Sequence, residues 1–156
     1  MNIAKFVATA AMAMALAVLG MAAEARAEAL EGADAASVRK AVEGHLAALA
    51  AGDAKALFEL ASPAARAEVG SPEALMERLA PVAWLARRAD AATFSEPDAE
   101  GLGADAIATQ AVRLEGGGGA WIVIFALQRA GAPHAWAVAG AGFAPIPTKP
   151  PSGKSI

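Results

Sequence analysis

Hydrophobic residues in the first half of the chain recur at the spacing of a helix. Between residues 38 and 49 they fall every three or four positions, which is the period of one helix face. Asp34 is a suitable N-cap because its carboxylate can accept hydrogen bonds from free backbone N–H groups, and Gly52 suits a C-terminal cap. We therefore predict a helix from Asp34 to about Ala51. The residues along its apolar side are Val38, Val42, His45, Leu46 and Leu49.

Three shorter helices are predicted to follow. The pair Gly52–Asp53 predicts a tight corner, with the aspartate as the N-cap of the next helix. Ser62–Pro63 and Ser71–Pro72 each combine a capping serine with a proline at the first helical position. Pro81 is expected to end the last helix, because an internal proline removes a backbone hydrogen bond. The predicted ranges are 54–61, 63–69 and 72–80.

After the helices the pattern changes from helical to alternating, which indicates strands. Four strands are predicted, each paired antiparallel with its neighbour in sequence. Their ranges are 88–95, 104–115, 120–129 and 135–144. The connections are a loop over 96–103, a hairpin turn over Gly116–Gly119 and a turn over Gly131–His134. The segment 145–156 has four prolines and no apolar cluster, so we expect a disordered tail after a domain over 34–144.

The third predicted strand is apolar on both faces. Trp121, Val123, Phe125 and Leu127 alternate on one face, and Ile122, Ile124 and Ala126 on the other. Helices can cover only one of these faces, and a strand exposed to water on its other side normally carries polar residues there. We therefore expect a homodimer that forms through the open sheet face.

The N-terminus has the order of a secretory signal. Lys5 precedes an uncharged segment over 6–23, and Ala25-Arg26-Ala27 supplies the small residues of a cleavage site. We predict a signal peptide over 1–27, cleavage before Glu28, a periplasmic or secreted domain, and only transient membrane contact. The alternative is a retained anchor, since an uncharged segment of 18 residues is at the lower end of the length that spans a bilayer.

Alanine accounts for most of the high apolar content. The chain holds 47 alanines among 156 residues, so the 56% hydrophobic fraction overstates the supply of large core side chains. The formal net charge is -3, and acidic and basic residues are scattered without a basic face. Nucleic-acid binding requires such a face to displace phosphate counterions, and we exclude it as a function.

Several chemistries lack their residues. Without cysteine there is no thiolate nucleophile, disulfide or thiolate metal site, and the two histidines are far apart in sequence. The glycine run over 116–119 has no following Lys-Ser/Thr and joins strands, so it is not a phosphate loop. No Gly-x-Ser-x-Gly motif is present. We predict neither a metal site nor a cofactor.

The order of elements resembles the cone-shaped fold of the nuclear-transport-factor-2-like superfamily. Within it, the chain is similar to the bacterial exported domain-of-unknown-function family 4864 from Val38 to Phe143. The most specific part is the stretch 61–73, and His45 and Ala80 depart from the residues common in that family. The matching positions are Ala61-Ser62-Pro63, Arg66, Val69-Gly70, Pro72-Glu73, Pro81-Val82, Gln110 and Trp136-Ala137-Val138-Ala139-Gly140. The resemblance implies a fold but no activity.

Five residues are candidates for a site between the helices and the sheet. His45 is a pocket base or a core histidine whose nitrogens are satisfied by neighbours. Asp90 is a second candidate base, or a solvated residue at a strand start. Gln110 could line a pocket or a sheet edge, while Trp121 and Trp136 are core residues or ligand contacts. Enzymes of the resembled superfamily usually use a tyrosine donor, and this chain has no tyrosine.

The sequence predicts an α+β domain in which N-terminal helices pack on a curved antiparallel sheet of about four strands. The expected function is non-catalytic: small-molecule binding, with a small apolar ligand, or protein interaction and dimerisation. The alternative is a small isomerase- or lyase-like enzyme with His45 or Asp90 as base. A third possibility is a subunit of a larger envelope assembly.

Overall fold

After a two-residue strand at Glu28–Ala29, the helices come first along the chain and the other strands follow. The computed structural model describes residues 28–101, 103–131 and 135–147. The helices are α2 (Gly32–Ala51), α3 (Ala54–Leu60), α4 (Pro63–Val69) and α5 (Pro72–Arg88). The strands are β1 (Glu28–Ala29), β2 (Ala91–Phe94), β3 (Asp98–Glu100), β4 (Ile107–Gly116), β5 (Gly119–Arg129) and β6 (Trp136–Ile146), with a 3-10 turn at Gly103–Asp105. The predicted α+β class, with helices N-terminal to an antiparallel sheet, is confirmed.

The predicted end of the first helix and the predicted starts of the three helices that follow are confirmed by their caps. Gly52 ends α2 in the left-handed region at φ 70°, where only glycine is unstrained. The side chain of Asp53 accepts a hydrogen bond from the backbone N–H of Ala56 at 3.0 Å. Ser62 and Ser71 accept equivalent bonds at the starts of α4 and α5, each at 3.2 Å. These signals are local in sequence, which explains why the pattern alone located them.

The predicted role of Asp34 as the cap of the first helix is wrong. Helix α2 begins two residues earlier, at Gly32, and its N-cap Glu31 makes no side-chain capping bond. Asp34 lies in the first turn instead. Its carboxylate accepts hydrogen bonds from Arg129 and Trp136, which lie about a hundred residues further along the chain. These charged and indole donors compete successfully with the local backbone N–H groups.

The prediction that Pro81 ends the last helix is also wrong. Helix α5 continues through Pro81 to Arg88, so the predicted strand over 88–95 shortens to β2. The proline is exposed and costs one backbone hydrogen bond, but the continuation buries Ala83 and Leu85 against the rest of the domain. Packing therefore overrides a local helix-breaking signal.

The sheet has more strands than the four predicted. Its order is β1-β3-β4-β5-β6, and β2 also pairs with β4, so six short and long strands share one antiparallel sheet. The predicted loop over 96–103 contains β3, and the predicted strand start at residue 104 falls in the 3-10 turn. The Gly116–Gly119 hairpin is confirmed by positive φ angles at Gly117 and Gly118.

The last strand runs further than expected. β6 continues to Ile146, two residues into the segment predicted to be a disordered tail. A register shift between Ala126 and Leu127 on β5 marks an irregularity in its pairing with β6. The remaining tail over 148–156, the turn residues 132–134 and the predicted signal segment 1–27 lie outside the described residues.

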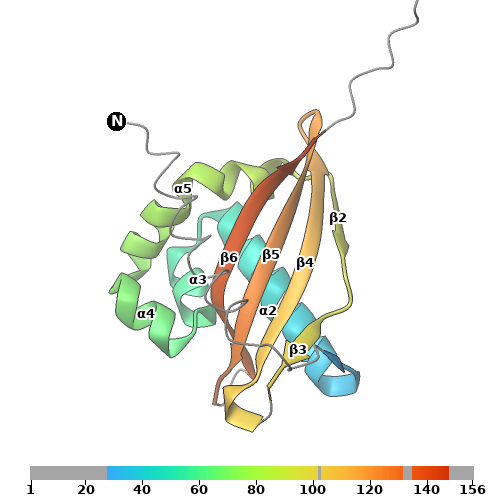
Figure 1. Ribbon diagram of the computed structural model, residues 1–156. Helices are drawn as coiled ribbons and strands as arrows, with labels where there is room; N and C mark the ends of the chain where they lie inside the picture. Colours follow the sequence, from blue (N-terminus) through green and yellow to red (C-terminus); the bar gives the residue numbers. More distant parts are fainter. Residues whose placement is uncertain (1–27, 102, 132–134, 148–156) are drawn as a thin grey trace, which may run out of the picture.

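The core lies between one sheet face and the helices. Figure 1 shows α2 crossing behind the long strands, with α3, α4 and α5 beside it. The helices cover the face of β5 that carries Val123, Phe125 and Leu127, all three of which are buried. The neighbouring strands contribute Ala108, Val112, Leu114, Trp136 and Val138 to the same cluster. Among the described helices, none is long and apolar enough to cross a membrane.

The backbone at the end of helix α5 lies directly against the backbone of β4 at Gly116. A Cβ atom at Gly116 would collide with the carbonyl oxygen of Arg88, the last residue of α5. Glycine is therefore required here by close approach rather than by its backbone conformation. This close approach lies at the point where α5 ends and the chain turns into β2.

Candidate functional site

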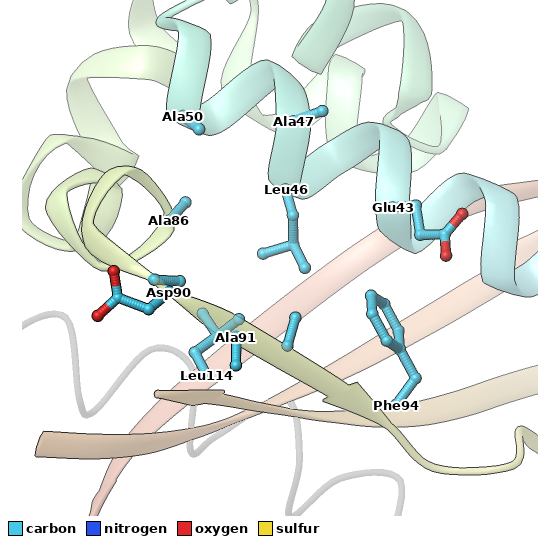
Figure 2. A pocket seen from close by; sticks show the side chains of 11 residues that line it. Glu43, Leu46, Ala47, Ala50, Ala86, Asp90, Ala91, Phe94 and Leu114 are labelled. Atoms are coloured by element: carbon cyan, nitrogen blue, oxygen red, sulfur yellow. The ribbon is translucent and has the colours of Figure 1, made fainter. Parts of the chain in front are cut away.

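An open groove lies where α2, the end of α5 and β2 meet. Its volume is about 280 Å³. Figure 2 shows Leu46 of α2 pointing into it, with Phe94 and Leu114 on the sheet side. Alanines form most of the remaining wall: Ala47, Ala50, Ala86, Ala89, Ala91 and Ala92. Because alanine ends at Cβ, this wall is apolar and leaves the space between the elements unfilled.

An acidic residue lies at each end of the groove, with its carboxylate directed away from the hollow (Figure 2). Glu43 lies at the end nearest Phe94, and Asp90 lies at the other, where α5 gives way to β2 (Figure 2). Arg39 donates from Nε to Oε1 of Glu43 at 2.6 Å, and its guanidinium lies 3.6 Å above the Phe94 ring. Asp90 makes no side-chain hydrogen bond or ion pair with any other described residue. Of the two acidic residues, Asp90 alone is therefore unpaired among the described residues.

His45 lies in the core and not in the groove. It is 5% exposed, and its ring meets that of Phe125 edge-on at 5.3 Å. Burial lowers its pKa to about 4, so the imidazole is neutral at neutral pH. The expectation that neighbours satisfy its nitrogens is wrong for the described residues, where neither Nδ1 nor Nε2 has a partner.

The side chain of Gln110 is also enclosed in the core, and it links β4 to the segment between β2 and β3. It is 2% exposed, and its Nε2 donates to the backbone oxygen of Ser95 at 2.8 Å. Ser95 lies between β2 and β3, and both of these short strands pair with β4. The hydrogen bond from Gln110 therefore holds the segment between β2 and β3 next to β4. The Oε1 atom of Gln110 has no partner among the described residues.

The structure does not bring the five sequence candidates into one site. Asp90 is exposed and lines the groove, whereas His45 and Gln110 do not. Trp121 is half-buried and packs edge-on against Trp84, 5.8 Å away, beside a much smaller hollow. Trp136 is a fully buried core residue.

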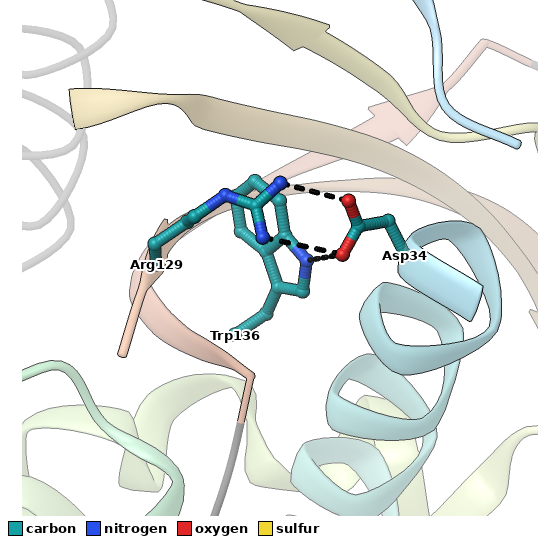
Figure 3. Close-up of polar contacts among 3 residues, drawn as sticks. All are labelled: Asp34, Arg129 and Trp136. Carbon is teal, nitrogen blue, oxygen red and sulfur yellow. Dashed lines mark hydrogen bonds and ion pairs between the residues drawn. The ribbon is translucent and has the colours of Figure 1, made fainter. Parts of the chain in front are cut away.

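A polar cluster that the sequence pattern did not indicate holds the start of α2 to the last two strands. Arg129 Nη2 donates to Asp34 at 2.7 Å, and its Nη1 donates to the other carboxylate oxygen at 3.3 Å (Figure 3). The indole Nε1 of Trp136 donates to the same carboxylate at 3.3 Å, and the guanidinium lies 4.6 Å from the indole ring. The hydrogen bond from Arg129, followed by that from Trp136, lowers the pKa of Asp34. Only the fold brings these three residues together.

The sheet face opposite the helices is open and apolar at its centre. Ile124 is 53% exposed and lies between Ala111 of β4 and Gly142 of β6. Ile122 shares this face, next to Ala144 on β6. Ile124 thus projects between an alanine and a glycine, while the half-buried Ile122 has Arg113 of β4 on its other side.

Comparison with known proteins gives one match. Neither the curated proteins nor the solved structures include a significant match to this chain. A family model, the domain of unknown function DUF4864, matches residues 31–149, a range that spans the four described helices and strands β2 to β6. The chain therefore belongs to the DUF4864 family of domains of unknown function.

Proposed function

We propose that this chain is a non-catalytic interaction domain that pairs with a second copy of itself through the open sheet face. The observation that carries the proposal is the exposure of Ile124, at 53%, in the middle of the longest strands. A solvent-facing sheet normally alternates apolar and polar residues, and a large exposed aliphatic side chain at the centre of such a face favours a partner.

The neighbours of Ile124 suit close approach by another sheet. Ala111 and Gly142 lie directly across from it, and Gly140 lies beside Ala126, two residues further along β5 on the same face. These small residues leave shallow depressions on either side of the isoleucine. In a two-fold arrangement, each copy's Ile124 would enter the depression next to its counterpart, which is the self-complementarity that such an interface needs.

The area of the open sheet face limits the expected affinity of the dimer. Three strands about 4.8 Å apart and about 30 Å long offer roughly 400 Å² per copy, which is about half of a standard interface. Only the centre of this area is apolar, since Arg113 and Glu115 form an ion pair at one end of β4. We therefore expect a weak dimer whose population depends on protein concentration.

Sedimentation velocity over a wide concentration range tests this proposal. The mature chain should shift from monomer toward dimer as its concentration rises from about 5 to about 500 µM. Ile124→Lys should remain monomeric, because each copy would bury an unpaired ammonium group. Thr93→Lys is the matched control, since Thr93 is exposed on the short strand β2 away from the centre. A wild-type chain that stays monomeric throughout, or dimers unaffected by Ile124→Lys, would contradict the proposal.

The non-catalytic part of the proposal is supported by the placement of the candidate bases. His45 and Gln110 are enclosed in the core, and Asp90 is the single candidate on the groove wall. An isomerase-like reaction needs a base and a hydrogen-bond donor that reach the same substrate atoms. Asp90 has no such donor beside it among the residues that line the groove.

We further propose that the domain has the nuclear-transport-factor-2-like cone and is exported to the periplasm or beyond. The order of helices followed by an antiparallel sheet supports the first part, and the sequence over 1–27 supports the second. Cleavage before Glu28 would leave β1 intact, whose two residues pair with Asp98 and Ala99. N-terminal sequencing of the chain produced in a secreting bacterium should begin at Glu28. A retained Met1 would contradict export by cleavage.

A further inference from the structure

We infer that residues 148–156, which follow the last strand, fold back over the open sheet face and compete there with the second copy of the chain. The competition rests on the proposed dimer. The docking itself rests on the place where the segment starts, on its charge and on its length. The segment reads Thr148-Lys149-Pro150-Pro151-Ser152-Gly153-Lys154-Ser155-Ile156.

The segment starts at a corner of the open face. Ile146, the last residue of β6, pairs with Ala120 on β5, and both lie on the same side of the sheet as Ile124, because alternate residues of a strand share a face. Figure 1 shows β6 ending beside the hairpin that joins β4 to β5. Only Pro147 separates this corner from residue 148, so the segment begins beside the surface that it would cover.

The segment and the opposite corner of the sheet carry opposite charges. The segment contains Lys149 and Lys154 and no acidic side chain. At the opposite corner lie Asp98 and Glu100 of β3, on the side of the sheet that carries Ile124. Neither carboxylate forms an ion pair with another described residue. Attraction between these groups therefore directs the segment across the face.

The length of the segment matches the diagonal of the face. Asp98 is aligned across the strands with Gly140 of β6, which lies six residues before Ile146. Six residues along a strand and three strand spacings across it give a diagonal of about 25 Å. The eight residues from Ile146 to Lys154 span about the same distance in an extended, proline-rich conformation. The direct line passes within about 4 Å of Ile124 in the plane of the sheet, so the segment covers the centre that the second copy needs.

The expected contact is weak, because charges that are open to water attract one another only modestly. A short flexible connection holds the segment near the face at an effective concentration in the millimolar range. With an intrinsic dissociation constant of about 1 mM, the segment would be docked about half of the time. A dimer needs both faces free, so this docking would weaken the dimer about fourfold.

A spin label on the segment tests the docking in the monomer. The chain has no cysteine, so Ser155→Cys carries a nitroxide at a single position. In the isotopically labelled mature chain at low concentration, we expect the amide signals of β3 and of the face centre to lose intensity. Asp98→Asn with Glu100→Gln should reduce the loss on β3, whereas Asp90→Asn, an exposed and unpaired carboxylate on the helix side, should not. Full intensity on β3, or an equal loss after Asp98→Asn with Glu100→Gln, would overturn the inference.

Sedimentation velocity tests the competition. Lys149→Gln with Lys154→Gln releases the segment and should tighten the dimer by up to about fourfold, while Ser152→Ala should leave it unchanged. Without docking, the loss of two positive charges makes an acidic chain more acidic and favours dissociation. A dimer that is equally strong or weaker after the lysine substitutions would therefore overturn the inference. A label effect without any dimer would support the docking and refute the dimer, so the two proposals fail separately.

Discussion

Acidification should destabilise this domain through one buried side chain, His45. In the folded chain its pKa is lowered from 6.5 to about 4, because burial penalises the charged imidazolium. Above pH 6.5 the ring is neutral in both the folded and the unfolded chain, so its ionisation has no effect on stability. As the pH falls below 6.5, the unfolded chain takes up a proton that the folded chain refuses until about pH 4. Stability therefore falls across this window and changes no further below it.

The size of the effect follows from the two pKa values. A shift of one unit corresponds to about 1.4 kcal/mol, so the full loss is about 3 kcal/mol. Between about pH 7.5 and about pH 5 the expected loss is about 2 kcal/mol. This interval is useful because most carboxylates have not yet begun to titrate, so the histidine dominates the change. A loss of this size is a large part of the stability of a small domain.

Urea unfolding at the two pH values, followed by tryptophan fluorescence, measures the effect. His45→Gln and His45→Leu remove the ionisable group and should lose about 2 kcal/mol less than the wild type over the same interval. Each variant is compared with itself at the other pH, so its own packing cost cancels. If the wild type and both variants lost the same amount, or if His45 titrated near 6.5 in the folded chain, the assignment of burial as the cause would be refuted.

Three further substitutions test particular contacts of the fold. Gly116→Ala should lower the free energy of unfolding by about 1 to 3 kcal/mol in urea titrations, because its Cβ would collide with the carbonyl oxygen of Arg88. An unchanged urea midpoint would show that α5 and β4 can move apart without a loss of stability. Asp34→Asn should lower the melting temperature by a few degrees near neutral pH, by removing the charge paired with Arg129. Since the pKa of Asp34 is lowered, this difference should disappear as the pH falls through that pKa, and a difference that persists in acid would contradict the ion pair. Pro81→Ala should raise the free energy of unfolding by about 1 to 2 kcal/mol, because a regained backbone hydrogen bond outweighs the greater freedom of the unfolded chain; a lower value would indicate that the proline is needed.

The sequence predicted those elements that are encoded locally. The corner at Gly52–Asp53 and the cap at Ser71 depend on residues within one turn, so the pattern located them closely. Pro81 by itself predicts a helix end, but α5 continues through it to Arg88. The apolar positions continue in phase beyond it, through Leu79, Ala83 and Ala86, and this continuation was the signal that packing would carry the helix on.

The candidate site was less predictable than the fold. The open face of β5 followed from simple alternation, since both sets of residues were visibly apolar. The groove did not, because it depends on where α5 stops relative to the sheet and on alanines that carry no chemical signal. Asp90 was identified as a candidate, but its separation from His45 depends on tertiary packing that no spacing in the sequence reveals.

The contact of Asp34 with Arg129 and Trp136 has a consequence for the order in which the chain can fold. Helix α2 is synthesised before the residues that hold its beginning, because Arg129 and Trp136 follow Asp34 by 95 and 102 residues. Contacts between such distant residues form late, because a long loop must close before they can stabilise anything. A chain that is still being made therefore cannot complete its core, and a nascent domain stays open until β6 has emerged.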